Sequence, residues 1–305
     1  MHPGVSGRIV YSSPFVPAEL IAAHGFVPER TIPRRRSAPP EGVCPFAQAF
    51  ADSVGAGTGA AAAIFTTMCD QMRRAVETVR GRDAPPLFVL NVPHTWQTAG
   101  ARRYYAAELD RLGRFLQGLG GVPTADADLA RVMREHDDAR RAGAASAAGG
   151  VTPGDGAAPV AVVGGPLSAG DRVLFDCIAR AGGAVVLDAT EHGERALPLP
   201  FDRRRLGGDP RGELAAAYFD GIVDAGRRPN TELYRWLKAR LAARAVRGIV
   251  FAHYAWCDAW HAEAARMREW ARLPFLCLEL TGEAGAAAVL AHRVEAFVET
   301  VRCAP

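Results

Sequence analysis

Six cysteines are spread along the chain, and three of them stand where a thiol could do chemistry. They occupy positions 44, 69, 177, 257, 277 and 303. Cys69 follows the apolar run AAAIFTTM and Cys257 follows GIVFAHYAW, so each lies between a predicted buried strand and a predicted helix. The free N–H groups and the positive dipole end of a helix favour a thiolate at such a position. Because the thiolate is the form that binds metal, both cysteines are candidate ligands.

Cys44 is the third candidate ligand, and it precedes Pro45, which biases its backbone toward an extended loop conformation. Three loop cysteines from distant parts of the chain could converge in one cleft. Their spacing differs from the C-x-x-C pairs of structural zinc sites and from the cysteine run of a ferredoxin. The spacing admits either a zinc site with an open position or an iron–sulfur cluster that lacks one protein ligand.

The other three cysteines are predicted to have no chemical role. Cys177 shares an apolar helix face with Val173 and Leu174, and Cys277 lies inside the strand PFLCLEL. Both fit the small buried hydrophobe that a free cysteine usually is. Cys303 lies in the tail of the chain.

Three polar side chains are candidate catalytic groups beside the cysteines. His94 follows the strand PLFVLNVP, His253 precedes the third cysteine, and Glu279 ends the strand FLCLEL. Parallel strands bring their carboxyl ends to one edge of a sheet, so each residue could face the cleft. The histidines would serve as proton donors or substrate contacts and Glu279 as a general base, with a packing or bridging role as the alternative. His261, on a predicted helix, is expected to be a solvent-facing or packing residue.

The elements that must position these residues are strands alternating with helices. We predict strands at 60–68, 86–92, 159–164, 184–188, 247–254 and 274–280. Predicted helices cover 69–80, 100–119, 126–141, 168–181, 212–224, 230–244, 258–272 and 284–301. Continuous apolar strands that alternate with helices are typical of parallel sheets covered on both faces. The sequence therefore predicts an α/β protein with two doubly wound parallel-sheet halves.

A segment at 141–158, RAGAASAAGGVTPGDGAA, is rich in glycine and alanine and has no hydrophobic period. It is predicted to be a linker or an extended surface loop. It divides the chain into an N-terminal half, 1–140, which carries Cys44 and Cys69, and a C-terminal half, 159–305, which carries Cys257. We expect the three cysteines to meet in the cleft between these halves.

Composition limits the class of protein. The 305-residue chain is 49% hydrophobic and 23% charged, as soluble globular proteins are. Its 36 basic and 33 acidic residues give a formal net charge of +3, which gives little reason to expect nucleic-acid binding. No run of about 18 apolar residues predicts a membrane span, and the N-terminus lacks the pattern of a signal peptide. We expect a cytoplasmic protein whose cysteines are thiols or metal ligands.

Several stretches, taken in order, resemble the 2-hydroxyacyl-CoA dehydratase family, which also contains the benzoyl-CoA reductase subunits and the double-cubane cluster reductases. The stretch IFTTMCDQMRR at 64–74 is the most specific of them. The others are YSSPFVPAELIAAHGFVPER at 11–30, Cys44-Pro45, VPHTWQTAGARRYYAAELDRLGRFL at 92–116, the Gly164-Gly165 turn, FAHYAWCD at 251–258 and RVEAFVE at 293–299. Together they run through most of the chain.

The resemblance implies two flavodoxin-like halves around an oxygen-sensitive 4Fe–4S cluster, held by Cys44, Cys69 and Cys257 with one iron left open. It implies a dimer with a paralogous subunit or a second copy, and a separate ATP-hydrolysing iron–sulfur activator. In the dehydratases, one low-potential electron reduces the thioester carbonyl of the acyl-CoA substrate to a ketyl radical anion. This radical expels the 2-hydroxyl group, loses a β-proton and returns the electron, which leaves a 2-enoyl-CoA. The expected activity is that of a lyase.

Three alternatives stay open. A reductase of the benzoyl-CoA or double-cubane type would leave the electron in its product and could carry an 8Fe–9S double-cubane cluster. A non-catalytic paralogue would hold a cluster for electron transfer or support an active partner. A zinc hydrolase, which the cysteines alone would also admit, is the least favoured of the alternatives.

Overall fold

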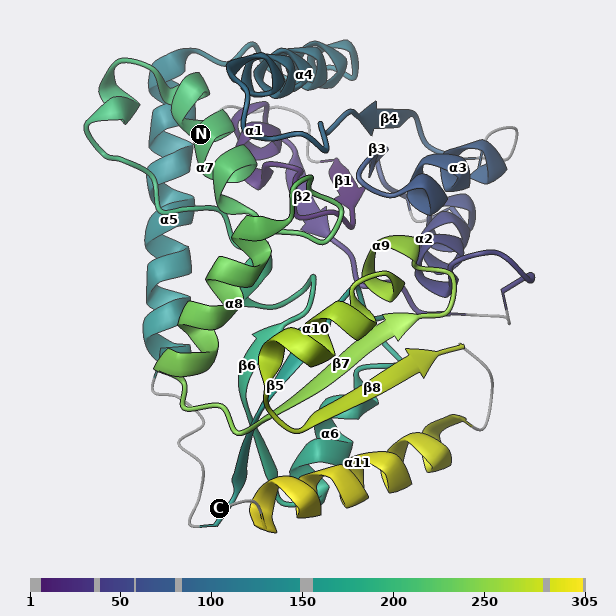
Figure 1. Ribbon diagram of the computed structural model, residues 1–305. Coiled ribbons are helices and arrows are strands. Elements are labelled where there is room, and N and C mark those ends of the chain that lie inside the picture. Colours follow the sequence, from purple (N-terminus) through teal and green to yellow (C-terminus); the bar gives the residue numbers. More distant parts are fainter. Residues whose placement is uncertain are drawn as a thin grey trace.

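The computed structural model describes residues 7–35, 39–57, 59–79, 84–148, 156–281 and 286–303. Within these ranges the chain forms two four-stranded sheets, and every strand pair in both sheets is parallel. Helices flank each sheet (Figure 1). The predicted α/β class with two parallel-sheet halves is confirmed, and the arrangement is consistent with two flavodoxin-like halves.

The first sheet has the strand order β2-β1-β3-β4. Its strands are β1 (Arg8–Tyr11), β2 (Val27–Arg30), β3 (Ala62–Thr66) and β4 (Leu87–Leu90). The helices in this part of the chain are α1 (Ala18–Ala23), α2 (Pro45–Gly55), α3 (Asp70–Val79), α4 (Ala99–Gly118) and α5 (Asp126–Ala148).

The second sheet repeats this plan with the strand order β6-β5-β7-β8. Its strands are β5 (Ala158–Gly164), β6 (Gly183–Ala189), β7 (Gly248–Tyr254) and β8 (Phe275–Leu280). The helices are α6 (Val173–Arg180), α7 (Pro210–Gly221), α8 (Thr231–Ala243), α9 (Asp258–His261), α10 (Ala264–Ala271) and α11 (Ala286–Cys303), with 3-10 turns η1 (Glu194–Ala196) and η2 (Arg205–Gly207).

The strands that lead to two of the candidate cysteines are the most deeply buried. Strand β3, AAIFT, and strand β7, GIVFAHY, are buried at every position. Each is an inner strand of its sheet, so both of its faces are covered, and a continuous apolar sequence is what such a position requires. Cys69 follows β3 and Cys257 follows β7. The carboxyl edge of each sheet therefore presents one cysteine.

Helix α7 packs on the first half of the molecule although it follows β6 in the sequence. It contacts α4 and α5, and Figure 1 shows it beside α5. Its Leu214 and Phe219 belong to the same apolar cluster as Ile9 of β1. The hydroxyl of Tyr218 donates to buried Glu19 Oε2 at 2.7 Å. The helical layer over the first sheet thus draws on residues from both sides of the predicted linker.

The longest helices are amphipathic. Helix α4 spans 20 residues, buries Tyr105, Leu109 and Leu112, and leaves Arg102 exposed. In the described part of the chain, no helix combines the length and the apolar character that crossing a membrane requires. These helices cover the sheets instead.

The differences from the predicted elements have local causes. The elements β1, α1, β2 and α2 were not predicted; the first three have only four to six residues, and β2 reads VPER, which shows no apolar alternation. The predicted helix at 258–272 is broken into α9 and α10. Helix α5 continues past its predicted end at 141, because the first part of the predicted linker is rich in alanine, the best helix former. Residues 149–155 of that linker lie outside the described residues.

Candidate functional site

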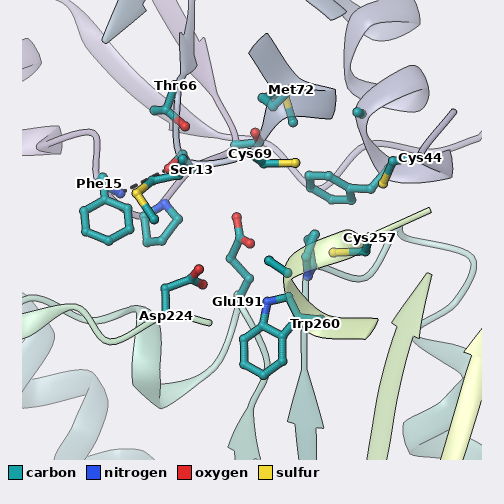
Figure 2. A pocket seen from close by; sticks show the side chains of 17 residues that line it. Ser13, Phe15, Cys44, Thr66, Cys69, Met72, Glu191, Asp224, Cys257 and Trp260 are labelled. Atoms are coloured by element: carbon teal, nitrogen blue, oxygen red, sulfur yellow. Dashed lines mark hydrogen bonds between the residues drawn. The ribbon is translucent and has the colours of Figure 1, made fainter. Parts of the chain in front are cut away.

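One cavity is lined by all three candidate cysteines (Figure 2). Cys44 and Cys69 come from the half with the first sheet, and Cys257 comes from the half with the second. The other lining residues are Ser12, Ser13, Pro14, Phe15, Phe46, Ala47, Thr66, Met68, Met72, Pro166, Glu191, Asp224, Ala259 and Trp260. The structure thus brings together, between the two halves, the cysteines that the sequence analysis singled out.

Cys44 and Cys69 each stand at the start of a helix, and one side chain joins the two starts. Cys44 is the N-cap of α2 with extended backbone angles, φ −62° and ψ 123°, as its place before Pro45 predicts. Cys69 immediately precedes α3. Gln71, in the first turn of α3, accepts a hydrogen bond from the N–H of Cys44 at 3.1 Å and donates to the carbonyl of Gly42 at 3.0 Å. The Cys44 loop is therefore fastened to the helix that follows Cys69.

Cys257 occupies the equivalent place in the other half. It is the N-cap of α9, in the loop that leaves β7. Its N–H donates to the carbonyl of Tyr254 at 3.0 Å, and its own carbonyl accepts from the N–H of His261 at 2.8 Å. The predicted position of Cys69 and Cys257 at helix N-termini is confirmed.

The cavity disfavours three free thiolates. Burial raises the pKa of Cys44 to about 12, although hydrogen bonds from backbone N–H groups of α2 partly lower it. Burial also raises the pKa of Cys69, and it raises the pKa of Cys257 well above its usual value, with added repulsion from the other two sulfurs. All three are free cysteines. A positively charged metal centre reverses this preference, because metal-bound thiols lose their protons.

The spacing of the sulfur atoms bears on the kind of metal centre. In the described part of the chain, the three Sγ atoms do not all lie within 4.8 Å of one another. Thiolates bound to one zinc ion at about 2.3 Å would have sulfur atoms about 3.8 Å apart. At least one pair of these sulfur atoms is therefore farther apart in this structure than two thiolates on one zinc ion.

Asp224 brings a carboxylate into the cavity, and a buried arginine holds it there. Arg195, which is 1% exposed, donates to Asp224 Oδ2 at 2.8 Å. Its other N–H groups donate to backbone carbonyls, and its guanidinium lies 4.5 Å from the ring centroid of Trp260. This arginine thus fixes both a carboxylate and an aromatic wall of the cavity.

Glu191 brings a second carboxyl group into the cavity, as Figure 2 shows. Burial raises its pKa to about 7, Arg195 opposes that rise, and the charge of Asp224 adds to it. Within the described residues its carboxylate makes no hydrogen bond, whereas its backbone carbonyl accepts one from Arg30. The sequence analysis missed both carboxylates. Glu191 follows the carboxyl end of β6, so the strand-end rule could have found it, but Asp224 follows a helix and gave no such signal.

The three candidate catalytic residues lie outside this cavity. His94 is exposed; its Nδ1 donates to the carbonyl of Gly226 at 2.7 Å, and its Nε2 lies 3.4 Å from the carbonyl of Thr67. His253 and Glu279 face each other across β7 and β8 and do not line the cavity. Their catalytic roles stay predictions.

Solved structures resemble the chain only weakly. A mutation variant of SsGBP aligns with a TM-score of 0.28 and 9% identity, covering 98% of this chain and 100% of that chain. The periplasmic zinc binding protein TroA from Treponema pallidum gives a TM-score of 0.27 at 10% identity, covering 98% and 99%. The SBP FpvC from P. aeruginosa, in complex with Ni2+, gives 0.27 at 13% identity, covering 98% and 97%. At such TM-scores these structures carry no argument about this chain.

Sequence comparisons are more informative at the level of the family. No curated protein matches the chain. A family model described as 2-hydroxyglutaryl-CoA dehydratase, D-component, matches residues 14–148 and 143–301. The first match contains Cys44 and Cys69, and the second contains Cys257. The resemblance noted in the sequence is confirmed, and the chain belongs to the 2-hydroxyglutaryl-CoA dehydratase D-component family.

Proposed function

We propose that this chain is the iron–sulfur subunit of a 2-hydroxyacyl-CoA dehydratase-like enzyme, which removes water from a 2-hydroxyacyl-CoA to give a 2-enoyl-CoA. The observation that carries the proposal is the meeting of Cys44, Cys69 and Cys257 at one cavity between the two halves. Among the described residues that line it there is no arginine, lysine or histidine. Family membership supports a dehydratase-like subunit in general terms.

The three thiols would hold a 4Fe–4S cluster and leave one iron without a cysteine ligand. Three features of the cavity fit that group: the thiols are free, their sulfur atoms do not all lie within 4.8 Å of one another, and burial opposes their ionisation unless a cation joins them. When bound, the cluster would supply a low-potential electron and a Lewis-acidic iron for a thioester substrate.

One carboxyl group of this chain would supply a proton to the substrate, and a second would provide a fixed negative charge. The hydroxyl group of the substrate must take up a proton to leave as water. Glu191 would hold that proton on its carboxyl group, because it lines the cavity and its carboxylate has no hydrogen-bond partner in the described structure. Asp224 is engaged by Arg195 and would act as a fixed negative charge. Phe15 and Met72 would exclude water from the same space.

The description of the family as one component of a dehydratase supports a multi-subunit enzyme. We propose a paralogous subunit or a second copy of this chain as the partner. A separate ATP-dependent iron–sulfur activator would deliver the electron.

Metal content tests the site directly. Protein purified without oxygen is assayed for iron and acid-labile sulfide and is examined by EPR after reduction. We expect about four irons per chain in the wild type, and loss of the cluster in Cys44→Ala, Cys69→Ala and Cys257→Ala. Cys177→Ala is the matched control, since Cys177 is as buried as Cys44 and Cys257 but packs in the core beside α11. Folded wild-type protein without iron would overturn the proposal, and about eight irons would point to a double-cubane reductase instead.

Turnover tests the reaction. Conversion of a 2-hydroxyacyl-CoA to a 2-enoyl-CoA is expected only after activator, ATP and reductant have been supplied, and without net consumption of electrons. A product that retains the electrons would assign the chain to the reductases. Failure to bind any acyl-CoA, with the cluster and a partner retained, would assign it to the non-catalytic paralogues.

A further inference from the structure

A second group of side chains with potential metal ligands lies at the carboxyl ends of β7 and β8, outside the cysteine cavity. His253, His261 and Glu279 each place a ligand atom within 4.8 Å of the other two. His253 and Glu279 are register partners on the neighbouring strands β7 and β8, and His261 ends the short helix α9. None of the three lines the cavity of the cysteines. Three separate elements thus converge on one point.

The ring of His253 is already oriented as a ligand. The residue is 2% exposed, and its Nδ1 lies 3.1 Å from the carbonyl of Tyr254. A carbonyl only accepts, so Nδ1 carries the proton and Nε2 presents its lone pair. Burial lowers the pKa of His253. The hydrogen bond to the Tyr254 carbonyl raises this pKa, and the charge of His261 lowers it further. The neutral imidazole, with one nitrogen fixed by a carbonyl, is the form that binds metals in proteins.

The other two ligands are open to solvent. The side chains of His261 and Glu279 are 59% and 50% exposed, and His261 Nδ1 lies 3.7 Å from Glu279 Oε2. The rings of His253 and His261 meet edge to face with their centroids 5.2 Å apart. The thiol of Cys277 lies 3.7 Å from Nε2 of His253. An ion can therefore reach the group directly from solution and find two nitrogens, one carboxylate and a nearby sulfur.

We propose that His253, His261 and Glu279 bind one divalent transition-metal cation of the Zn²⁺ class. Two imidazoles with one carboxylate form a donor set that zinc and its neighbours favour, whereas Mg²⁺ and Ca²⁺ favour oxygen ligands. Three protein ligands leave a fourth position for water or for the sulfur of Cys277. The bound ion would hold α9 against the ends of β7 and β8, and Cys257 is the N-cap of α9.

The test is zinc binding to the full-length protein with its iron content recorded, in anaerobic buffer. We expect one tightly bound zinc per chain in the wild type and in Cys69→Ser, a variant that removes one thiol from the other cavity. Affinity should fall by at least about tenfold in His261→Ala and in Glu279→Gln. Both residues are exposed, so these variants are expected to fold. His292→Ala is the matched control, because His292 and Glu295 form an exposed His–Glu pair on α11 with a separation of 3.8 Å.

X-ray absorption at the zinc edge identifies the ligands. We expect a shell of nitrogen and oxygen at about 2.0–2.2 Å with at most one sulfur at about 2.3 Å. A shell dominated by sulfur would place the zinc at the three cysteines and overturn the proposal. Equal zinc affinity in the wild type, His261→Ala and Glu279→Gln would overturn it as well.

Discussion

The side chain of Gln71 accepts a hydrogen bond from the backbone N–H of Cys44, with 3.1 Å between the two heavy atoms. The same amide group donates to the carbonyl of Gly42. Gln71 therefore links the first two cysteines of the cavity through two hydrogen bonds, from a position two residues after Cys69.

Replacing Gln71 with alanine should loosen the Cys44 loop more than it destabilises the fold. Two hydrogen bonds at about 0.5–1.5 kcal/mol each set the largest expected loss in the free energy of unfolding. Iron should be extracted by a chelator faster from Gln71→Ala than from the wild type. Gln48→Ala is the control, since Gln48 makes a half-buried side-chain hydrogen bond to Asp52 within α2. Equal extraction rates in the two variants would show that Gln71 does not support the site.

Replacing Arg195 with methionine should be strongly destabilising. It removes the partner of Asp224 and leaves several buried carbonyls without a donor, so we expect a loss of about 3–5 kcal/mol in urea unfolding. Arg131→Met, which breaks an exposed pair with Glu135, should cost about 0–1 kcal/mol. Adding Asp224→Asn to Arg195→Met should recover part of the loss, and a double variant no better than the single one would contradict the pairing.

Glu191 should matter for turnover and not for the cluster. If its carboxyl group holds the proton that the leaving hydroxyl group takes up, Glu191→Gln should lower turnover by about 10²–10⁴-fold. Its iron content and EPR signal should match those of the wild type. Glu135→Gln, on the exposed face of α5, serves as the control. Unchanged turnover in Glu191→Gln would remove this residue from the mechanism.

His192 should make the protein sensitive to acid. Burial, with the charges of Arg30, Arg172 and Arg195, lowers its pKa from 6.5 to about 3, and both of its ring nitrogens are buried without a hydrogen-bond partner. The unfolded chain binds a proton below pH 6.5 and the folded chain does not. The free energy of unfolding is therefore unaffected by this residue above pH 6.5, and it decreases as the pH falls from 6.5 toward 3.

His192→Leu removes that dependence. Between pH 7.5 and pH 5.0, the free energy of unfolding of the variant should improve relative to the wild type by about 2 kcal/mol, as urea titrations at both pH values can measure. His292→Leu, at an exposed position on α11, should show no such gain. A parallel fall with pH in wild type and His192→Leu would refute the assignment.

The sequence predicted the strands and helices that have a regular hydrophobic pattern, and it also predicted the residues that directly follow them. The buried strands β3 and β7 were visible as apolar runs, and they led directly to Cys69 and Cys257 at the starts of the next helices. Cys44 was found through its proline, although α2 itself was not predicted. A cysteine next to a predictable strand, helix or proline can therefore be identified from the sequence.

Glu191, close behind a strand end, could have been found from the sequence, whereas Asp224 could not, because its place depends on tertiary contacts. Asp224 follows a helix end, and its place in the cavity depends on Arg195, 29 residues earlier in the chain. The position of His94 after a strand suggested an active-site residue, yet its ring is held by the carbonyl of Gly226, 132 residues away. Hydrogen bonds across such separations leave no pattern in the sequence.

The packing of α7 on the first half has a consequence for the order in which the chain folds during synthesis. Leu214 and Phe219 complete the apolar cluster around β1, and Tyr218 caps buried Glu19 of α1. A ribosome has already made β5 and β6 before these residues emerge. The N-terminal half therefore cannot finish its core first, as a leading domain commonly does. The two halves must mature together, and the pocket of Cys44 and Cys69 acquires its final walls only when most of the chain has been translated.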